Sequence, residues 1–237
     1  MAVETLQSQV GGAAGGARET QIARPKLAVD TVLFAIAGAR LKCYLVQLQG
    51  GAAVGKWGFP GGLVRVGETL DEAARRELDD AAGLRDLYLE QLFSFGDPSR
   101  DPGAHVVSVG YMGLIDAAGA AKSASRKYAD GQWFEVGGLP ALAYDHSVIA
   151  DYALRRLKSK LEYTNIACNL LPPTFTFAEL QELYATVLER PLDRRNFRRR
   201  IMAMGLLKRL PQKRRGAHRP AALYAFRHRS VQVIEML

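Results

Sequence analysis

Short apolar runs dominate the first two thirds of the chain and set its expected secondary structure. They are rich in aliphatic and β-branched side chains, and glycine, proline and charged residues separate them, a pattern typical of β-strands. Residues 117–121 lack such a pattern and are expected to form a loop. We expect strands at residues 27–36, 41–48, 88–95, 106–115 and 132–136.

Two segments among these strands carry the spacing and end signals of helices. Thr69 and Glu72 form a capping box, so a helix is expected to begin after Thr69 and to end with Gly83 as its C′ residue. A second helix is expected over 145–162, where apolar residues recur at near-helical intervals. Strands interrupted by two helices predict an α/β/α sandwich around a mixed sheet for residues 24–162.

The last third has a different pattern, with two short helices followed by a hairpin. Thr176 and Glu179 form a second capping box, and Asp193 is placed to cap the next helix. Helix, turn, arginine-rich helix and basic hairpin are the layout of a winged helix-turn-helix domain, expected here over 163–237. The expected elements are helices at 177–189 and 194–204 and a ribbon of 206–210 with 221–227, joined by a basic turn at 211–220.

The overall composition is ordinary, but charge is distributed unevenly along the chain. The 237 residues are 48% hydrophobic and 24% charged, which is ordinary for a soluble globular protein, and a Gly- and Ala-rich stretch at 1–23 predicts a flexible tail. The expected helices and strands place the chain in the α+β class. No stretch has a membrane span or secretion signal, and the two cysteines lack metal-site spacing, so we expect a cytoplasmic protein with reduced thiols.

Net charge is concentrated in the C-terminal third. Residues 163–237 hold 14 Lys and Arg against 5 Asp and Glu, whereas residues 1–162 hold 18 against 19. Most charge runs are solvated helix faces, but five arginines in seven residues repel one another unless an anion is present. We therefore expect double-stranded DNA as a partner. The candidate contacts are Arg194, Arg195, Asn196, Arg198, Arg199, Lys213, Arg214, Arg215 and Arg219.

The clearest chemical motif surrounds the first expected helix. Seven residues occur in the fixed spacing Gly-x5-Glu-x7-Arg-Glu-Leu, followed by Gly-Leu: Gly62, Glu68, Arg76, Glu77, Leu78, Gly83 and Leu84. This spacing resembles the Nudix box, in which glutamates hold Mg²⁺ against a diphosphate. Two positions depart from the box, because Asp80 and Ala81 stand where the family has paired glutamates. The second change removes a carboxylate that is a metal ligand in the family.

The resemblance implies a set of site residues. The remnants of the catalytic box are Glu68, Arg76, Glu77 and Asp80, of which Glu77 and Asp80 match metal positions for weak Mg²⁺ binding, and no residue is assigned as catalytic. Arg76 has two interpretations, contacting phosphate or holding Glu77 and the loop. Phe59 is either a stacking or a core residue. The expected ligand-binding residues are Lys56, Phe59, Gly61, Gly62, Arg76, Glu77, Arg100 and His105.

A Nudix box combined with a basic winged helix is similar to the Nudix-related transcriptional regulators of NAD metabolism. That resemblance implies a homodimeric DNA-binding repressor of NAD-metabolism genes. Its Nudix domain would bind ADP-ribose or a related NAD-derived metabolite that modulates operator binding, with no cofactor required. The alternative is an active Mg²⁺-dependent ADP-ribose pyrophosphatase with a basic accessory domain.

Overall fold

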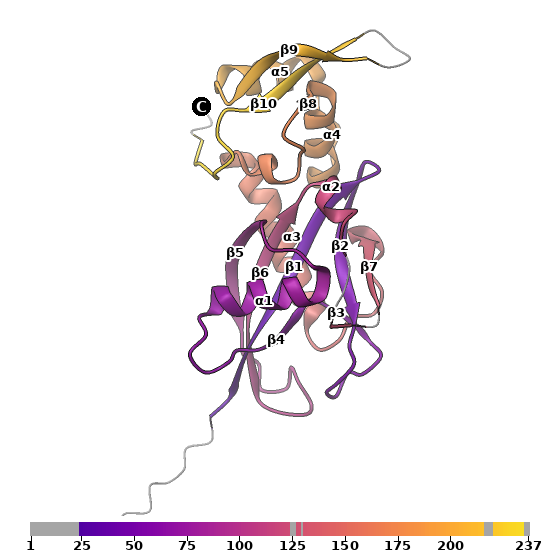
Figure 1. Cartoon of the computed structure of the whole chain (residues 1–237), viewed down its shortest axis with the longest axis vertical. Coiled ribbons are helices and arrows are strands. Elements are labelled where there is room, and N and C mark those ends of the chain that lie inside the picture. Colours follow the sequence, from indigo (N-terminus) through magenta and orange to yellow (C-terminus); the bar gives the residue numbers. More distant parts are fainter. Residues whose placement is uncertain (1–23, 124–126, 129, 216–219, 235–237) are drawn as a thin grey trace, which may run out of the picture.

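The chain forms two parts stacked along its long axis, with the mixed sheet in the larger part and the C-terminal third in the smaller (Figure 1). The computed structural model describes residues 24–123, 127–128, 130–215 and 220–234. The predicted N-terminal tail and Arg219 lie outside these residues. Within the described helices, no stretch combines the length and apolar character needed to cross a membrane.

A seven-stranded mixed sheet organises the larger part. Its order is β3-β2-β1-β6-β5, with β4 paired to β1 and β7 paired to β2. β1 runs parallel to β6 and antiparallel to both β2 and β4. The strands are β1 (Lys26–Ala37), β2 (Arg40–Gln47), β3 (Trp57–Gly58), β4 (Gly61–Leu63), β5 (Tyr88–Phe95), β6 (Val106–Ile115) and β7 (Gly131–Glu135).

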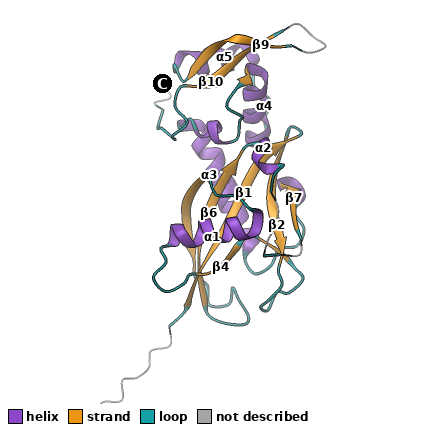
Figure 2. Cartoon of the chain, in the orientation of Figure 1, coloured by secondary structure: helices purple, strands orange, loops and turns teal. Residues whose placement is uncertain are grey.

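Two helices cover opposite faces of this sheet (Figure 2). Helix α1 (Leu70–Ala82) packs against one face with its buried alanines and Leu78. The capping box predicted at its start is present, and Gly83 closes it in the left-handed conformation with a φ of 67°. Helix α3 (His146–Tyr163) covers the other face. The α/β/α sandwich predicted from the sequence is confirmed.

The smaller part is a winged helix. A three-stranded sheet of order β8-β10-β9 stands beside two helices, and the second predicted capping box and the Asp193 cap are both present. The α+β fold class is therefore confirmed. The elements are η2 (Ile166–Asn169), β8 (Phe175–Thr176), α4 (Phe177–Leu188), α5 (Arg194–Ala203), β9 (Leu207–Arg214) and β10 (Ala221–Phe226).

A few local predictions were wrong. The segment expected as a loop after β6 begins with a short helix, α2 (Ala117–Ala120), because Asp116 caps it by accepting a hydrogen bond from the Gly119 N–H group at 2.8 Å. Pro211 lies inside β9 and not in a turn, since this edge strand tolerates a residue without an N–H donor. The short strands β3, β4 and β8 and the 3-10 turn η1 (Val136–Gly138) were not predicted.

One apolar core joins the two parts. Ile149, Leu157 and Leu161 of α3 belong to the same buried cluster as Met112 of β6 and Leu180 of α4. Polar contacts reinforce the junction: the Thr186 hydroxyl donates to the Ala39 carbonyl at 3.2 Å, and Lys158 pairs with Glu189 at 2.9 Å. Because one buried cluster contains side chains from both parts, we infer that the two parts unfold together.

Leu161→Ala tests this shared core. Leu161 is fully buried near the C-terminal end of α3, so the variant should lower the free energy of unfolding by about 2–5 kcal/mol. Both parts should lose structure in the same transition during urea unfolding followed by circular dichroism and tryptophan fluorescence. Ser159→Ala is the matched control, because Ser159 lies on the same helix but is exposed. Two separate transitions would contradict the shared core.

Candidate ligand pocket and nucleic-acid interface

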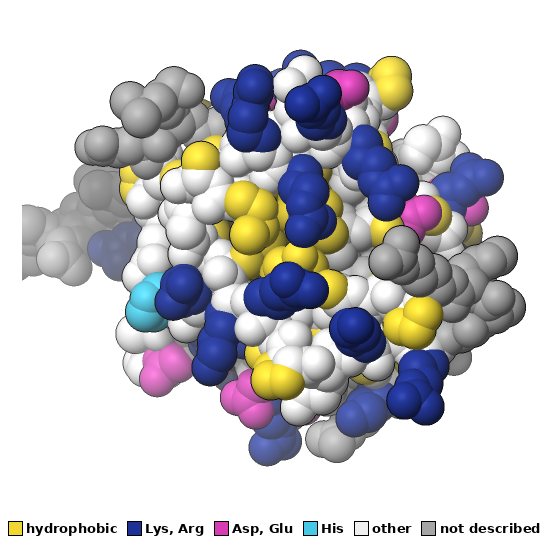
Figure 3. Space-filling model, turned by 90° about the horizontal axis from the view of Figure 1, so that it is seen from above, with side chains coloured by type: hydrophobic (Ala, Val, Ile, Leu, Met, Phe, Trp, Pro, Cys, Tyr) yellow, Lys and Arg dark blue, Asp and Glu magenta, His cyan; other side chains and the backbone are white. Residues whose placement is uncertain are grey.

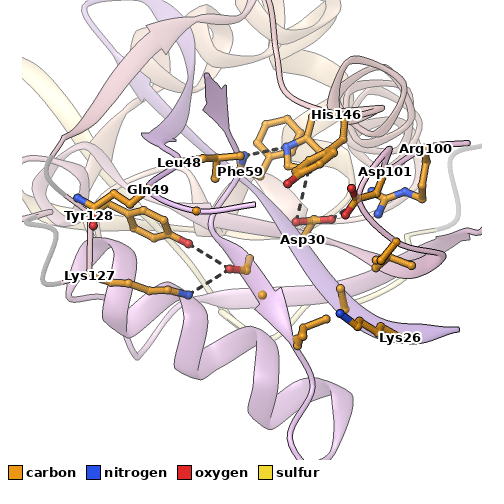
Figure 4. A pocket seen from close by; sticks show the side chains of 18 residues that line it. Lys26, Asp30, Leu48, Gln49, Phe59, Arg100, Asp101, Lys127, Tyr128 and His146 are labelled. Atoms are coloured by element: carbon orange, nitrogen blue, oxygen red, sulfur yellow. Dashed lines mark hydrogen bonds and ion pairs between the residues drawn. The ribbon is translucent and has the colours of Figure 1, made fainter. Parts of the chain in front are cut away.

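A cavity of about 450 Å³ opens beside β1 and β4 in the larger part (Figure 4). Strand β1 supplies its floor, β4 one wall, and the start of α3 another. The volume suits a small metabolite, since ligand pockets commonly enclose about 300–1,000 Å³. Its polar and aromatic lining includes Lys26, Asp30, Phe59, Arg100, Asp101, Lys127, Tyr128, Tyr144 and His146.

Asp30 anchors a charged cluster at the floor of this cavity. Its carboxylate accepts hydrogen bonds from Ser108 and, at 3.5 Å, from Arg100, and it lies 3.5 Å from Nε2 of His146. Burial favours the neutral acid, but His146, Ser108 and Arg100 outweigh it and hold the pKa of Asp30 below its ordinary value. Arg100 also binds Asp145, at 2.6 and 3.0 Å, just before α3 begins. The pocket floor is thus tied directly to that helix.

Phe59 and His146 form the next wall. Their rings stack with centroids 5.1 Å apart and planes 8° from parallel. The Phe59 backbone N–H donates to Nδ1 of His146 at 3.0 Å. This bond leaves Nε2 directed at Asp30, so a backbone contact sets the orientation of the imidazole ring. Phe59 is 1% exposed and also lines the cavity. Its position is therefore compatible with both predicted roles, stacking on a ligand and packing in the core.

Arg76 fastens the box loop to α1. Its guanidinium donates to both oxygens of Glu68, at 2.6 and 2.8 Å, and to the Leu63 carbonyl at 3.2 Å, and it also pairs with Glu77. The hydrogen bonds from Arg76 and from the Arg65 backbone lower the pKa of Glu68 to about 2. Arg76 is not among the lining residues of the cavity. This placement favours the interpretation in which Arg76 holds Glu77 and the loop.

The glycines of β4 allow the loop to lie directly on charged groups. A Cβ at Gly62 would stand 2.4 Å from Oε1 of Glu77, and one at Gly61 would stand 2.2 Å from Oδ1 of Asp30. Any larger residue would displace a buried carboxylate. The Gly61 carbonyl accepts hydrogen bonds from Tyr128 at 3.1 Å and from the Lys127 ammonium at 3.3 Å (Figure 4). Lys127 also pairs with Glu77.

The residues of the box do not fit a divalent metal. Among the described residues, no group of three or more His, Cys, Asp or Glu side chains is placed to share an ion. Ala81 is fully buried in an apolar cluster with Leu78, and its carbonyl accepts the Tyr44 hydroxyl hydrogen bond at 3.0 Å. Glu77 is already paired with two cations. Mg²⁺ needs several oxygen ligands in near-octahedral geometry, which this arrangement does not offer.

Some of the predicted ligand residues line the cavity and others do not. Phe59, Gly61, Gly62 and Arg100 line the cavity, while Lys56 and His105 do not, and Glu77 lies beneath the loop. Sequence reasoning missed seven charged or aromatic lining residues. Asp30 carried a signal, because a carboxylate inside a buried apolar strand needs partners, whereas the others lie on segments without a motif. The missed charged or aromatic residues are Lys26, Asp30, Asp101, Lys127, Tyr128, Tyr144 and His146.

The end of the molecule formed by the winged helix carries many Lys and Arg side chains and few acidic ones (Figure 3). Two of the predicted DNA-binding residues have partners within the chain. The Arg198 guanidinium lies 4.7 Å from the Phe177 ring centre and donates to the Tyr224 hydroxyl at 2.8 Å. Arg214 pairs with Glu179. Arg198 and Arg214 are nevertheless exposed, as are the remaining described candidates: Arg194, Arg195, Asn196, Arg199, Lys213 and Arg215.

Comparisons with known proteins match both parts. A family model described as "NUDIX domain" covers residues 24–157, and one described as "NrtR DNA-binding winged helix domain" covers residues 167–226. The "ADPR responsive transcriptional repressor NtrR" of Acinetobacter baylyi is 32% identical over 85% of this chain and 82% of its own length. The chain belongs to the NrtR family.

Solved structures of NrtR from Shewanella oneidensis share this architecture. Its complex with a 27mer DNA superposes with a TM-score of 0.77 at 32% identity, covering 85% of this chain and 93% of that one. Its Nudix domain with ADP-ribose superposes with a TM-score of 0.52 at 30% identity, covering 57% of this chain and 90% of that one. The resemblance to the NrtR family inferred from the box and the basic winged helix is confirmed.

Asp30→Asn tests the charged floor of this NrtR-family pocket. Removing one charge from a buried network leaves Arg100 and His146 poorly paired, so the free energy of unfolding should fall by about 3–5 kcal/mol at neutral pH. The pKa of Asp30 lies below its ordinary value of 3.8 in the folded chain. The wild-type advantage should therefore be complete above that pH and decline as pH falls through the folded-state pKa.

Urea unfolding of both chains at a series of pH values measures this difference. Asp86→Asn is the matched control, because Asp86 is exposed on a loop. If the difference in free energy of unfolding between the wild type and Asp30→Asn grew as the pH fell, the expected stabilisation by the ionised Asp30 would be contradicted.

Proposed function

We propose that this chain is a DNA-binding transcriptional repressor whose Nudix part binds ADP-ribose, or a closely related NAD-derived metabolite, and thereby weakens operator binding. The observation that carries this proposal is the presence, in one chain with one continuous core, of a nucleotide-sized pocket and a basic winged helix. The match to an ADP-ribose-responsive repressor over most of both chains supports it. Its target genes would be those of NAD metabolism, and it would act in the cytoplasm.

The exposed arginines of α5 support contact with DNA. In winged helix-turn-helix proteins the second helix enters the major groove, where arginine donates two hydrogen bonds to guanine. Arg195 and Arg199 are exposed on this helix. Arg198 instead braces the helix against α4 and β10 through Phe177 and Tyr224. We therefore assign Arg195 and Arg199 to the groove and give Arg198 a role in holding α5 at its angle.

The pocket has the chemistry to hold a dinucleotide-like ligand. Lys26, Arg100 and Lys127 bring positive charge to a cavity that also offers aromatic walls from Phe59, Tyr128 and Tyr144. Cations suit a diphosphate, and aromatic rings suit a base. The carboxylate of Asp30 is an acceptor for ribose hydroxyl groups. We propose that ADP-ribose lies across this cavity with its diphosphate near Gly61 and Gly62.

We also propose that the chain acts as a homodimer. β5 is an edge strand, paired with β6 alone among the described strands, and Phe93 on it is 55% exposed beside Val148, which is 53% exposed. Exposed apolar side chains along an unpaired edge favour a second chain at that surface. A dimer would present two α5 helices to a two-fold symmetric operator. A monomeric mass by light scattering, free and DNA-bound, would rule this out.

Replacing both Arg195 and Arg199 with Ala should abolish specific operator binding. Losing two charge-assisted contacts removes about 1–3 kcal/mol for each base-reading arginine. If the arginines instead hold phosphates, the plot of log K against the logarithm of the salt concentration should become shallower, its negative slope losing about two units in magnitude. Fluorescence anisotropy on a labelled promoter fragment at several salt concentrations separates these cases. Arg75→Ala, an exposed arginine on α1, is the control and should bind as the wild type.

ADP-ribose should weaken operator binding by the wild-type chain without being consumed. The physical reason is that a ligand shifts DNA affinity only if it prefers one of the two conformations. Anisotropy titrations with and without ADP-ribose measure the shift, while chromatography follows the nucleotide in the same samples. Hydrolysis of ADP-ribose without specific DNA binding would replace this proposal with the pyrophosphatase alternative.

A further inference from the structure

The box carboxylate that should face a metal ion faces a lysine. Glu77 is 2% exposed, and its two oxygens contact Arg76 on one side and the ammonium of Lys127 on the other. The same ammonium also donates a hydrogen bond to the Gly61 carbonyl oxygen at 3.3 Å. A carboxylate and a loop carbonyl are the kinds of ligand that Mg²⁺ takes in proteins. Lys127 therefore sits among the oxygen atoms that a divalent cation would use.

The position of Lys127 is built into the fold. Its backbone N–H group donates to the Asp80 carbonyl at 2.9 Å, which fixes it to the last turn of α1. The neighbouring Tyr128 donates its hydroxyl hydrogen bond to the Gly61 carbonyl at 3.1 Å, and the Lys127 ammonium lies 5.1 Å from the Tyr128 ring centre. These contacts distinguish Lys127 from a lysine that extends freely into solvent.

Charge and space both exclude a metal beside this ammonium. Lys127 and Arg76 already balance the carboxylates of Glu77 and Glu68, so a divalent ion placed here would bring two uncompensated positive charges. The carboxylate that would compensate is absent, because position 81 is an alanine buried against Tyr44 and Leu78. The missing carboxylate at Ala81 and the ammonium of Lys127 thus both disfavour metal binding.

We propose that Lys127 is a built-in cation that replaces the metal ion of the Nudix box and binds the diphosphate of the effector directly. Its side chain is 39% exposed and lines the cavity, so a phosphate oxygen can approach the ammonium from the cavity while the other side contacts Glu77. This inference rests on the proposed function. An ammonium attracts a diphosphate but cannot bind and activate water as Mg²⁺ does. Replacing the metal ion by a lysine ammonium thus retains diphosphate binding but removes hydrolysis.

Isothermal titration of the full chain with ADP-ribose, in EDTA and in Mg²⁺, tests the proposal. The wild type should bind equally in both buffers. Lys127→Ala should bind about tenfold to hundredfold more weakly in EDTA, since a charge-assisted hydrogen bond is lost. It should recover part of that loss in Mg²⁺, because the cation position is now open. Lys122→Ala, an exposed lysine just upstream, should bind as the wild type.

Two further measurements keep the outcomes distinct. Lys127→Gln fills nearly the same space and replaces Lys127→Ala if thermal melting shows that the alanine variant is unfolded. Mn²⁺ titration followed by electron paramagnetic resonance needs no effector: the wild type should show no tight site, and the Lys127 variant should show increased binding. A tight wild-type Mn²⁺ site that Glu77→Gln removes would overturn the lysine proposal. Failure of the wild type to bind ADP-ribose in either buffer would instead overturn the proposed effector.

Discussion

The packing of α3 against both parts of the chain is the interaction on which the rest of the structure depends. Its inward side is fully buried at Ile149, Leu157 and Leu161, and these residues share one apolar cluster with β6 and α4. The N-terminal end of the helix supplies His146 to the pocket. Its C-terminal end is fastened to the chain beyond the winged helix, where Ile234 donates its N–H to the Tyr163 carbonyl at 2.7 Å. Pocket and DNA interface are therefore attached to two ends of the same rigid element.

Local signals in the sequence predicted most of the fold. Capping boxes at Thr69 and Thr176 and the glycine at 83 define helix ends through contacts a few residues apart, and the structure has all three. Strand positions followed from apolar runs bounded by turn residues. The errors lie where tertiary contacts decide the outcome. Pairing with β1 makes a strand of the short Gly61–Leu63 segment, which has no strand pattern of its own.

The pocket was only half predictable for the same reason. Gly61, Gly62 and Arg100 were found because the box or a charged loop marks them, and they do line the cavity. Lys127 and Tyr128 come from a segment without a motif, and tertiary contacts such as the hydrogen bond from the Lys127 backbone to the last turn of α1 bring Lys127 to Glu77. In the winged helix, the sequence could not separate Arg198 from its neighbours. The difference depends on rings contributed by α4 and β10.

The length of α3 has a mechanical consequence. An 18-residue helix is about 27 Å long, so a tilt of about 5° at the pocket end displaces the other end by about 2 Å. Hydrogen bonds between arginine and base edges tolerate only a few tenths of an ångström before they weaken. A displacement of this size is therefore enough to break the register of a bound operator. In the proposed repressor, a helix of this length would let a side-chain adjustment at the pocket weaken the whole protein–DNA interface, without any element having to unfold.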